Sequence, residues 1–320
     1  MTILELPDEL LLEIFNPLFV PPSGTPSNKT RRHHQDGAVL PKVCRRFHRL
    51  ATSSVYTHLD VNFDTSDSSA VLLHRTLSEN AELRPYCRTL RLSLPDPDAD
   101  IINGTSGDER LAGLQAAMLT SMGLVRWLVN TRDLSIDGYF IHPKIEALTW
   151  SLVHRAGQHM GRLEKLILGG QVGLERVCEM LCAIKQLRTL EIDIGVIYGH
   201  FTQIMALPEQ KQMGSSSITS LSINYLLAHP GNLGRLLLMP ANLEHFAFNG
   251  MSPGCYWSWP LTDLVSALEP HQTTLQTVHV ASGKASSDAT NDNILEDQLE
   301  RLDLGAFTKL EGITLVEAPH

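Results

Sequence analysis

The segments Leu163-Glu164-Lys165-Leu166-Ile167-Leu168 and Leu187-Arg188-Thr189-Leu190-Glu191-Ile192 share one pattern. An aliphatic residue is followed by two variable residues and then by two aliphatic residues around one variable position. The last two aliphatic residues alternate, as a short strand with one buried face requires. The pattern returns clearly at 218–223, 243–248, 275–280 and 310–315, and in a weaker form at 87–92 and 131–136. We therefore expect a strand at each of these places.

Segments with helical spacing separate these strands. They cover 111–129, 145–155, 174–184, 261–268 and 294–302, and in 174–184 the residues Leu174, Val177, Cys178 and Leu181 share one face. Alternating strands and helices predict the α/β class. The same alternation also permits a doubly wound α/β domain, although no glycine-rich phosphate turn follows an early strand.

The repeat resembles a leucine-rich-repeat solenoid, in which parallel strands line a concave side and helices cover the convex side. The resemblance is to a degenerate version, because the Asn that normally follows each strand is missing. A solenoid would turn the variable strand residues to the concave side and gather the long inserts along one rim. One insert contains Cys255-Tyr256-Trp257-Ser258-Trp259-Pro260, and Trp and Tyr often anchor interfaces. The alternative is that these rings pack as a loop against the repeat.

The concave side and the rim would hold a target protein, because loops on a rigid scaffold commonly carry function. The candidate target-binding residues are Arg91, Asp137, Glu191, Asp193, Asn224, Asn249, Tyr256, Trp257, Trp259 and His279.

The N-terminal region has a different, helical pattern. Leu6-Pro7-Asp8-Glu9-Leu10-Leu11-Leu12-Glu13-Ile14-Phe15 predicts a helix start, with Pro7 in the first turn and acidic residues near the N-terminal end. Its apolar stripe is wider than a half-buried helix needs, so we expect part of it to contact a partner. A second helix is predicted from Leu40-Pro41-Lys42-Val43-Cys44-Arg45-Arg46-Phe47-His48-Arg49-Leu50, beginning late because of Pro41. In it Val43, Phe47 and Leu50 would share a face, and the two helices would have little core of their own.

These two segments resemble the F-box of fungal F-box proteins, a helical module that docks onto a Skp-type adaptor of cullin-RING ubiquitin ligases. The resemblance implies adaptor binding through Leu6, Pro7, Leu10, Ile14, Phe15, Leu18, Val43, Cys44 and Phe47. It implies an F-box at 1–55, ahead of the solenoid at 56–320. The segment at about 19–37 is longer than the usual F-box connection and is rich in Pro, Ser and Thr, so we interpret it as a disordered polar insertion. The alternative is an ordinary amphipathic helical hairpin.

Composition limits the other classes of function. The chain has 320 residues and a net charge of -9, which disfavours nucleic acid and anionic membranes as partners. It has 5 cysteines and no C-x-x-C pair, so we expect a reducing compartment, cytoplasmic or nuclear. No apolar run is long enough for a membrane span.

We expect no metal, no cofactor and no catalytic residues. Cys178 and Cys182 have the spacing of two metal ligands, but buried core thiols explain them better. The resemblance to F-box proteins implies a non-catalytic substrate-recognition subunit of a Skp-cullin-F-box ligase. The alternatives are an F-box scaffold acting outside ubiquitination and an α/β enzyme with a site that the sequence does not reveal.

Overall fold

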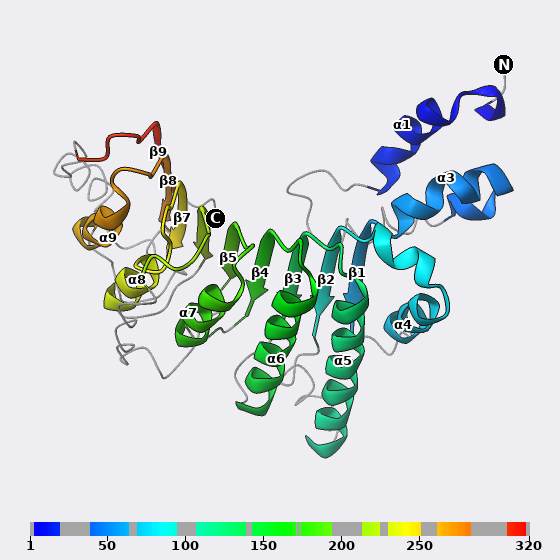
Figure 1. Ribbon diagram of the computed structural model, residues 1–320, viewed down its shortest axis with the longest axis horizontal. Coiled ribbons are helices and arrows are strands. Elements are labelled where there is room, and N and C mark those ends of the chain that lie inside the picture. The colour runs from blue at the N-terminus through cyan, green and yellow to red at the C-terminus, as the bar shows by residue number, and fades with distance from the viewer. Residues whose placement is uncertain are drawn as a thin grey trace. The chain divides into compact units, whose positions relative to one another are not determined.

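Nine strands form one parallel sheet in chain order in the computed structural model of this protein (Figure 1). The structure describes residues 3–19, 39–63, 69–94, 107–138, 143–170, 172, 174–193, 213–224, 230–250, 261–282 and 306–317. The strands are β1 (His58–Asn62), β2 (Thr89–Ser93), β3 (Asp133–Asp137), β4 (Lys165–Gly169), β5 (Thr189–Asp193), β6 (Ser220–Asn224), β7 (His245–Gly250), β8 (Thr277–Ser282) and β9 (Gly312–Glu317). Every strand predicted from the repeat is confirmed, and β1 is additional. The strand order has no reversal of the kind that defines a doubly wound sheet.

Helices connect most of these strands. The helices are α1 (Asp8–Phe19), α3 (Arg45–Val55), α4 (Ser69–Glu79), α5 (Gly107–Trp127), α6 (Pro143–His159), α7 (Leu174–Ala183), α8 (Pro230–Leu237) and α9 (Leu261–Leu268). Short 3-10 helices are η1 (Ile3–Glu5), η2 (Leu40–Lys42), η3 (Ala81–Tyr86) and η5 (Glu269–His271). The predicted helices at 111–129, 145–155, 174–184 and 261–268 are thereby confirmed as α5, α6, α7 and α9. The one at 294–302 lies outside the described residues. No helix in the described part of the chain is long and apolar enough to cross a membrane.

The chain divides into two compact units. The first comprises Met1–Leu134 with His159–Arg162, and the second comprises Ser135–Gln158 with Leu163–His320. This division lies within β3 and differs from the one at residue 55 in the sequence analysis. In the first unit, α3 contacts β1 and η3, so the helical N-terminus is continuous with the first strands.

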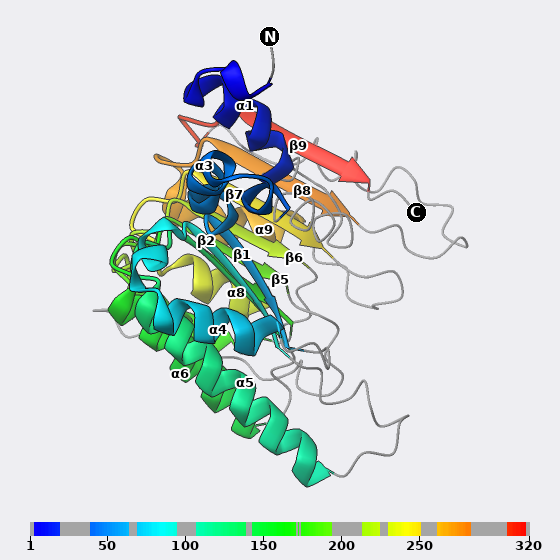
Figure 2. The ribbon, with the colours of Figure 1, turned by 90° about the vertical axis from the view of Figure 1, so that its right-hand side faces the viewer.

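In the second unit, the strands pair in register, and this stacks their aliphatic residues into two rows. One row contains Leu166, Leu190, Leu221, Phe246, Val278 and Ile313, and the other contains Leu168, Ile192, Ile223, Phe248, Val280 and Leu315. Members from β4 to β8 are buried, whereas Ile313 on the edge strand β9 is 39% exposed. Figures 1 and 2 show α6, α7, α8 and α9 along the same face of these strands. The two rows and these helices form the core of the unit.

Backbone carbonyl groups link neighbouring strands from β1 to β3 and from β4 to β9, just before the later strand of each pair begins. The Glu164 carbonyl accepts hydrogen bonds from the backbone N–H groups of Arg188 and Thr189, at 2.8 and 2.9 Å. The carbonyl groups of Arg188, Thr219, Glu244 and Gln276 each accept two N–H groups of the next strand in the same way. In the first unit, the carbonyl groups of Thr57 and Arg88 do the same. We call this arrangement the carbonyl ladder. It satisfies backbone groups locally, without side-chain amides.

Candidate functional site

The two N-terminal helices, α1 and α3, form a small module with a core of its own. Leu11, Phe15 and Phe19 on α1 are buried with Phe47 and Ala51 on α3. The rings of Phe15 and Phe47 meet edge to face, with centroids 4.8 Å apart and planes at 73°. The core is small, as expected, but Phe15 and Phe47 belong to it, although both were expected to contact an adaptor.

A second set of apolar side chains in this module is exposed. Leu10 and Ile14 are 44% and 48% exposed and are one helical turn apart, so they share one face of α1. Val43 is 59% exposed because it precedes the first residue of α3, where helical spacing does not apply. We call Leu10, Ile14 and Val43 the exposed apolar set; Ile3, Leu12 and Val39 of the same module are also exposed.

The residues expected to bind an adaptor therefore fall into three groups. Pro7, Leu10, Ile14 and Val43 are exposed, Leu6, Leu18 and Cys44 are partly buried, and Phe15 and Phe47 are buried. Cys44 has a structural task, because its sulfur accepts a hydrogen bond from the Phe47 N–H at 3.4 Å and caps α3. The insertion expected at 19–37 lies outside the described residues, apart from Phe19.

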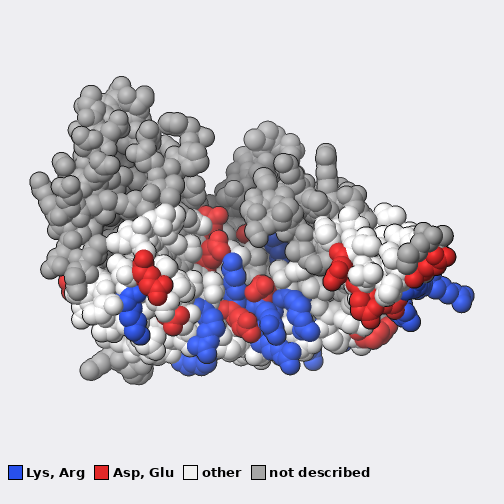
Figure 3. All heavy atoms as spheres, turned by 90° about the horizontal axis from the view of Figure 1, so that it is seen from above, with Lys and Arg blue, Asp and Glu red and all other residues white. Residues whose placement is uncertain are grey.

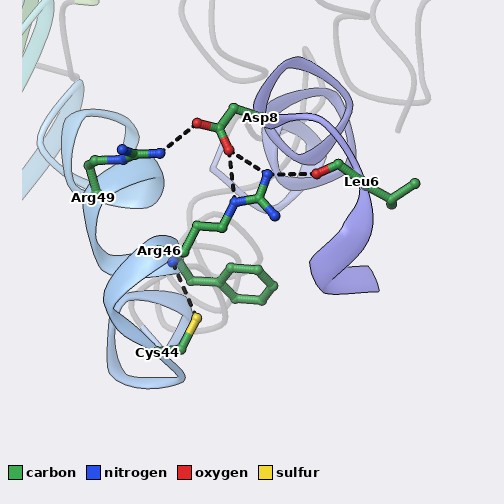
Figure 4. A network of polar contacts seen from close by, with 6 residues as sticks. Leu6, Asp8, Cys44, Arg46 and Arg49 are labelled. Carbon is green, nitrogen blue, oxygen red and sulfur yellow. Dashed lines mark hydrogen bonds and ion pairs between the residues drawn. The ribbon is translucent and has the colours of Figure 1, made fainter. Parts of the chain in front are cut away.

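A polar network joins the starts of α1 and α3 (Figure 4). Arg46 donates to Asp8 Oδ1 through Nε at 2.8 Å and through Nη2 at 2.6 Å. The same Nη2 donates to the Leu6 carbonyl at 2.6 Å, and Arg49 Nη2 donates to Asp8 Oδ2 at 2.6 Å. Hydrogen bonding from Arg46 holds the pKa of Asp8 below its usual value, so this carboxylate stays ionised. We call these four residues the Arg46 clamp.

In the second unit, side chains between the buried rows form a polar strand face with three carboxylates: Asp137 on β3, and Glu191 and Asp193 on β5. Asp193 pairs in register with Gly169 on β4, where no side chain stands. Asp137 fills that space, since a Cβ on Gly169 would lie 2.4 Å from Asp137 Oδ1. Burial and then the charges of Asp137 and Glu191 raise the pKa of Asp193.

Lysine and amide groups border these carboxylates. Lys165 Nζ on β4 lies 3.3 Å from Glu191 Oε2. Asn224 is the register partner of Asp193 on one side and of Asn249 on the other. Seen from above in Figure 3, Lys and Arg side chains lie among Asp and Glu side chains on the described part of that face. Such a surface favours contacts with particular partner groups over a long-range attraction to one charge.

The structure separates the other candidate target-binding residues. Arg91 belongs to the first unit, on β2, where it pairs in register with Asp60 of β1. His279 lies on β8 between Ala247 and Thr314. Tyr256, Trp257 and Trp259 lie outside the described residues.

Sequence reasoning missed Lys165 and the Arg46 clamp. Side chains alternate between the two faces of a strand, so Lys165, one residue before the buried Leu166, lies on the polar face with Ile167 and Gly169. That signal was available. No signal in the sequence pairs Asp8 with Arg46, which lies in another helix.

Cysteines and other residues of types that can ligate metal ions also occur in the described part of the chain. Among the described residues, no three His, Cys, Asp or Glu side chains are arranged to hold a metal ion. Cys178 is buried in α7, and Cys182 Sγ lies 3.4 Å from Ser215 Oγ. Burial raises the pKa of Cys87 to about 11, so this thiol stays protonated at neutral pH.

Comparison with known proteins adds no relative: no protein-family model matches the chain, and no curated protein matches it.

Proposed function

We propose that this protein is a substrate-recognition subunit of a Skp-cullin-F-box ubiquitin ligase. In this proposal the module of α1 and α3 is the F-box, and it docks onto a Skp-type adaptor. The observation that carries the proposal is the exposed apolar set. Leu10, Ile14 and Val43 stay exposed although Phe15 and Phe47 complete a core beside them. Apolar side chains on a small module gain free energy when a partner removes them from water.

The second part of the proposal concerns the strands. We interpret the in-register parallel sheet with its flanking helices as an irregular leucine-rich-repeat solenoid. Its polar strand face, with Asp137, Glu191 and Asp193, would contact the target. The protein would then act without catalysis, by raising the effective concentration of the target's lysines at the ubiquitin-loaded enzyme of the complex.

The test is co-purification of the full chain with a Skp-type adaptor. The variant Leu10→Asp with Ile14→Asp puts charges on the exposed apolar set and leaves the core of the module unchanged. Val71→Asp is the matched control, because Val71 on α4 is 64% exposed and lies outside the module. We expect the wild type and Val71→Asp to bind and the double variant to lose binding.

Absence of binding by the wild type would overturn the proposal. Binding by both variants would show that the exposed apolar set is not the docking face. Once binding is established, a scaffold role is separated from a ligase role by reconstituted ubiquitination. A ligase subunit increases ubiquitin transfer to its bound target, whereas a scaffold leaves the transfer unchanged.

A further inference from the structure

The Arg46 clamp joins two segments that carry the proposed docking residues. Asp8 is the first residue of α1, and Leu10 follows it within one helical turn. Arg46 lies in the first turn of α3, and Val43 stands just before the N-cap residue Cys44 of that helix. The clamp therefore connects the backbone on both sides of the exposed apolar set. A change in the clamp would move Leu10 and Ile14 relative to Val43.

The charges at the start of α3 indicate that the clamp is not incidental. The first turn of α3 contains Arg45 and Arg46 and no acidic residue. The positive end of a helix dipole disfavours cations there. Asp8 supplies the missing negative charge from another helix, and it favours the start of its own helix as well. The cations Arg45 and Arg46 disfavour the start of α3 locally. The carboxylate of Asp8 compensates for this only when α1 and α3 lie together.

The apolar core of the module fixes the angle between α1 and α3 less precisely than the hydrogen bonds of the Arg46 clamp do. The Phe15–Phe47 ring pair has a preferred geometry, whereas the aliphatic contacts of Leu11 have little directional preference and permit small changes in helix angle. Hydrogen bonds are directional. Arg46 also reaches the Leu6 carbonyl, which precedes α1, and so holds the turn between η1 and α1. The planar guanidinium serves both acceptors, which a lysine ammonium on its flexible stem does less well.

We infer that Arg46 is a positioning residue for adaptor binding, which fixes the starts of α1 and α3 so that the exposed apolar set presents one docking surface. This inference rests on the proposed function. Arg46 and Asp8 are both partly exposed, with side chains 31% and 35% accessible, so water and salt weaken the pair. The adaptor affinity should therefore depend on the clamp more than the stability of the module does.

The experiment measures adaptor affinity by calorimetry for the full chain and for Arg46→Lys, Asp8→Asn and the two combined. Thermal unfolding of each variant is followed by circular dichroism. We expect each single change to weaken binding about threefold, within the range that partly exposed ion pairs contribute. The combined variant should bind no more weakly than either single one, because both changes break the same contact. Arg49→Gln is the control. The Arg49 side chain is 69% exposed, and among the contacts in Figure 4 it bonds only Oδ2 of Asp8. Its effect on adaptor affinity should therefore be smaller.

The outcomes separate the two proposals. In one outcome the wild type binds, Leu10→Asp with Ile14→Asp does not, and both Arg46→Lys and Asp8→Asn bind like the wild type. The inference about Arg46 is then wrong, and the proposed function stands. Losses that multiply in the combined variant would also contradict it, because the two residues would then act independently. If the wild type does not bind the adaptor, both proposals fail. Should Arg46→Lys unfold the module, Asp8→Asn decides alone, since it leaves α3 unchanged.

Discussion

The strands of the second unit and the N-terminal helical module use apolar residues in opposite ways. From β4 to β8, the two aliphatic positions of each strand are buried in continuous rows. In α1, adjacent residues differ, since Leu11 is 0% exposed and Leu10 is 44% exposed. An apolar residue in the repeat therefore indicates core. In the module, it indicates core or contact surface, and only the packing of α1 against α3 distinguishes the two.

The largest loss of stability is expected for a substitution within the two buried aliphatic rows of the second unit. Phe246→Ala on β7 should lower the free energy of unfolding by about 3–5 kcal/mol, because it removes a large side chain from a site with 1% exposure. Denaturant unfolding measures this change. Ser222→Ala is the control, because Ser222 on neighbouring β6 points to the polar strand face, and it should change stability by no more than about 0.5 kcal/mol. Equal effects of the two changes would contradict the assignment of the rows to the core.

The adjacent leucines of α1 test the comparison within one helix. Leu11→Ala should destabilise the module by about 2–4 kcal/mol through the cavity that it leaves. Leu10→Ala should change stability by about 0.5 kcal/mol or less, since Leu10 packs little in the isolated chain. Denaturant unfolding monitored by circular dichroism gives both values. Equal losses would mean that Leu10 belongs to the core.

Gly169 tests how closely the strands approach at the polar strand face. Gly169→Ala should destabilise the second unit by about 1–3 kcal/mol, because the new Cβ would lie 2.4 Å from Asp137 Oδ1 and 3.3 Å from Asp137 Cα. Gly312→Ala on β9 is the matched control, since a Cβ there meets nothing within 4 Å. Thermal unfolding compares the two variants. A Gly169→Ala variant as stable as the control would show that Asp137 moves aside freely.

Acid should weaken the second unit through His271. This residue is 2% exposed, its Nε2 lies 2.7 Å from the Leu237 carbonyl, and its Nδ1 is buried with no hydrogen-bond partner. Burial lowers the pKa of His271 in the folded state. The unfolded chain therefore binds the proton more readily, so the contribution of His271 to stability is constant above the ordinary histidine pKa and falls as the pH drops through and below it.

Unfolding temperatures at several pH values measure this slope. His271→Gln should reduce the slope, because its amide can donate to the same carbonyl and does not titrate. A slope that persists unchanged in His271→Gln would assign the acid sensitivity to other groups.

The smallest expected effect is a shift in the pKa of Asp193. Asp137→Asn should lower the pKa of Asp193 toward its ordinary value, and Glu191→Gln should lower it less, because the charge of Asp137 contributes more to the raised pKa. NMR titration of Asp193 measures both shifts. A larger shift in Glu191→Gln would show that Glu191 and not Asp137 is the closer charge.

The sequence predicted most of the sheet, because its pattern has a period of two and strong aliphatic anchors. It missed β1, where the first anchor is Tyr56 ahead of Leu59 and Val61, so an aromatic residue hid the pattern. It missed α4 because Val71 and Leu72 are exposed and obscure the amphipathic spacing, and α8 because Gly231 and Gly234 are poor helix formers.

The candidate sites were less predictable than the fold. The wide apolar stripe of the first helix placed Phe15 with Leu10 and Ile14, and the resemblance to the F-box added Phe47 of the second helix to the same adaptor-binding set. Which of them point inward depends on the angle at which α3 meets α1. That angle depends on contacts such as Arg46 with Asp8, between residues far apart in the chain, and no local pattern encodes them.

The carbonyl ladder has a consequence for how this protein can change in evolution. The ladder itself consists of backbone groups, so it requires no particular side chain at the strand entries that it links. The chain distance between paired strand residues nevertheless varies, being shorter from Lys165 to Thr189 than from Thr277 to Gly312. Insertions and deletions can therefore accumulate where the chain leaves a strand, while the entry keeps the next strand in register. New loops could diversify at the strand exits without any redesign of the sheet.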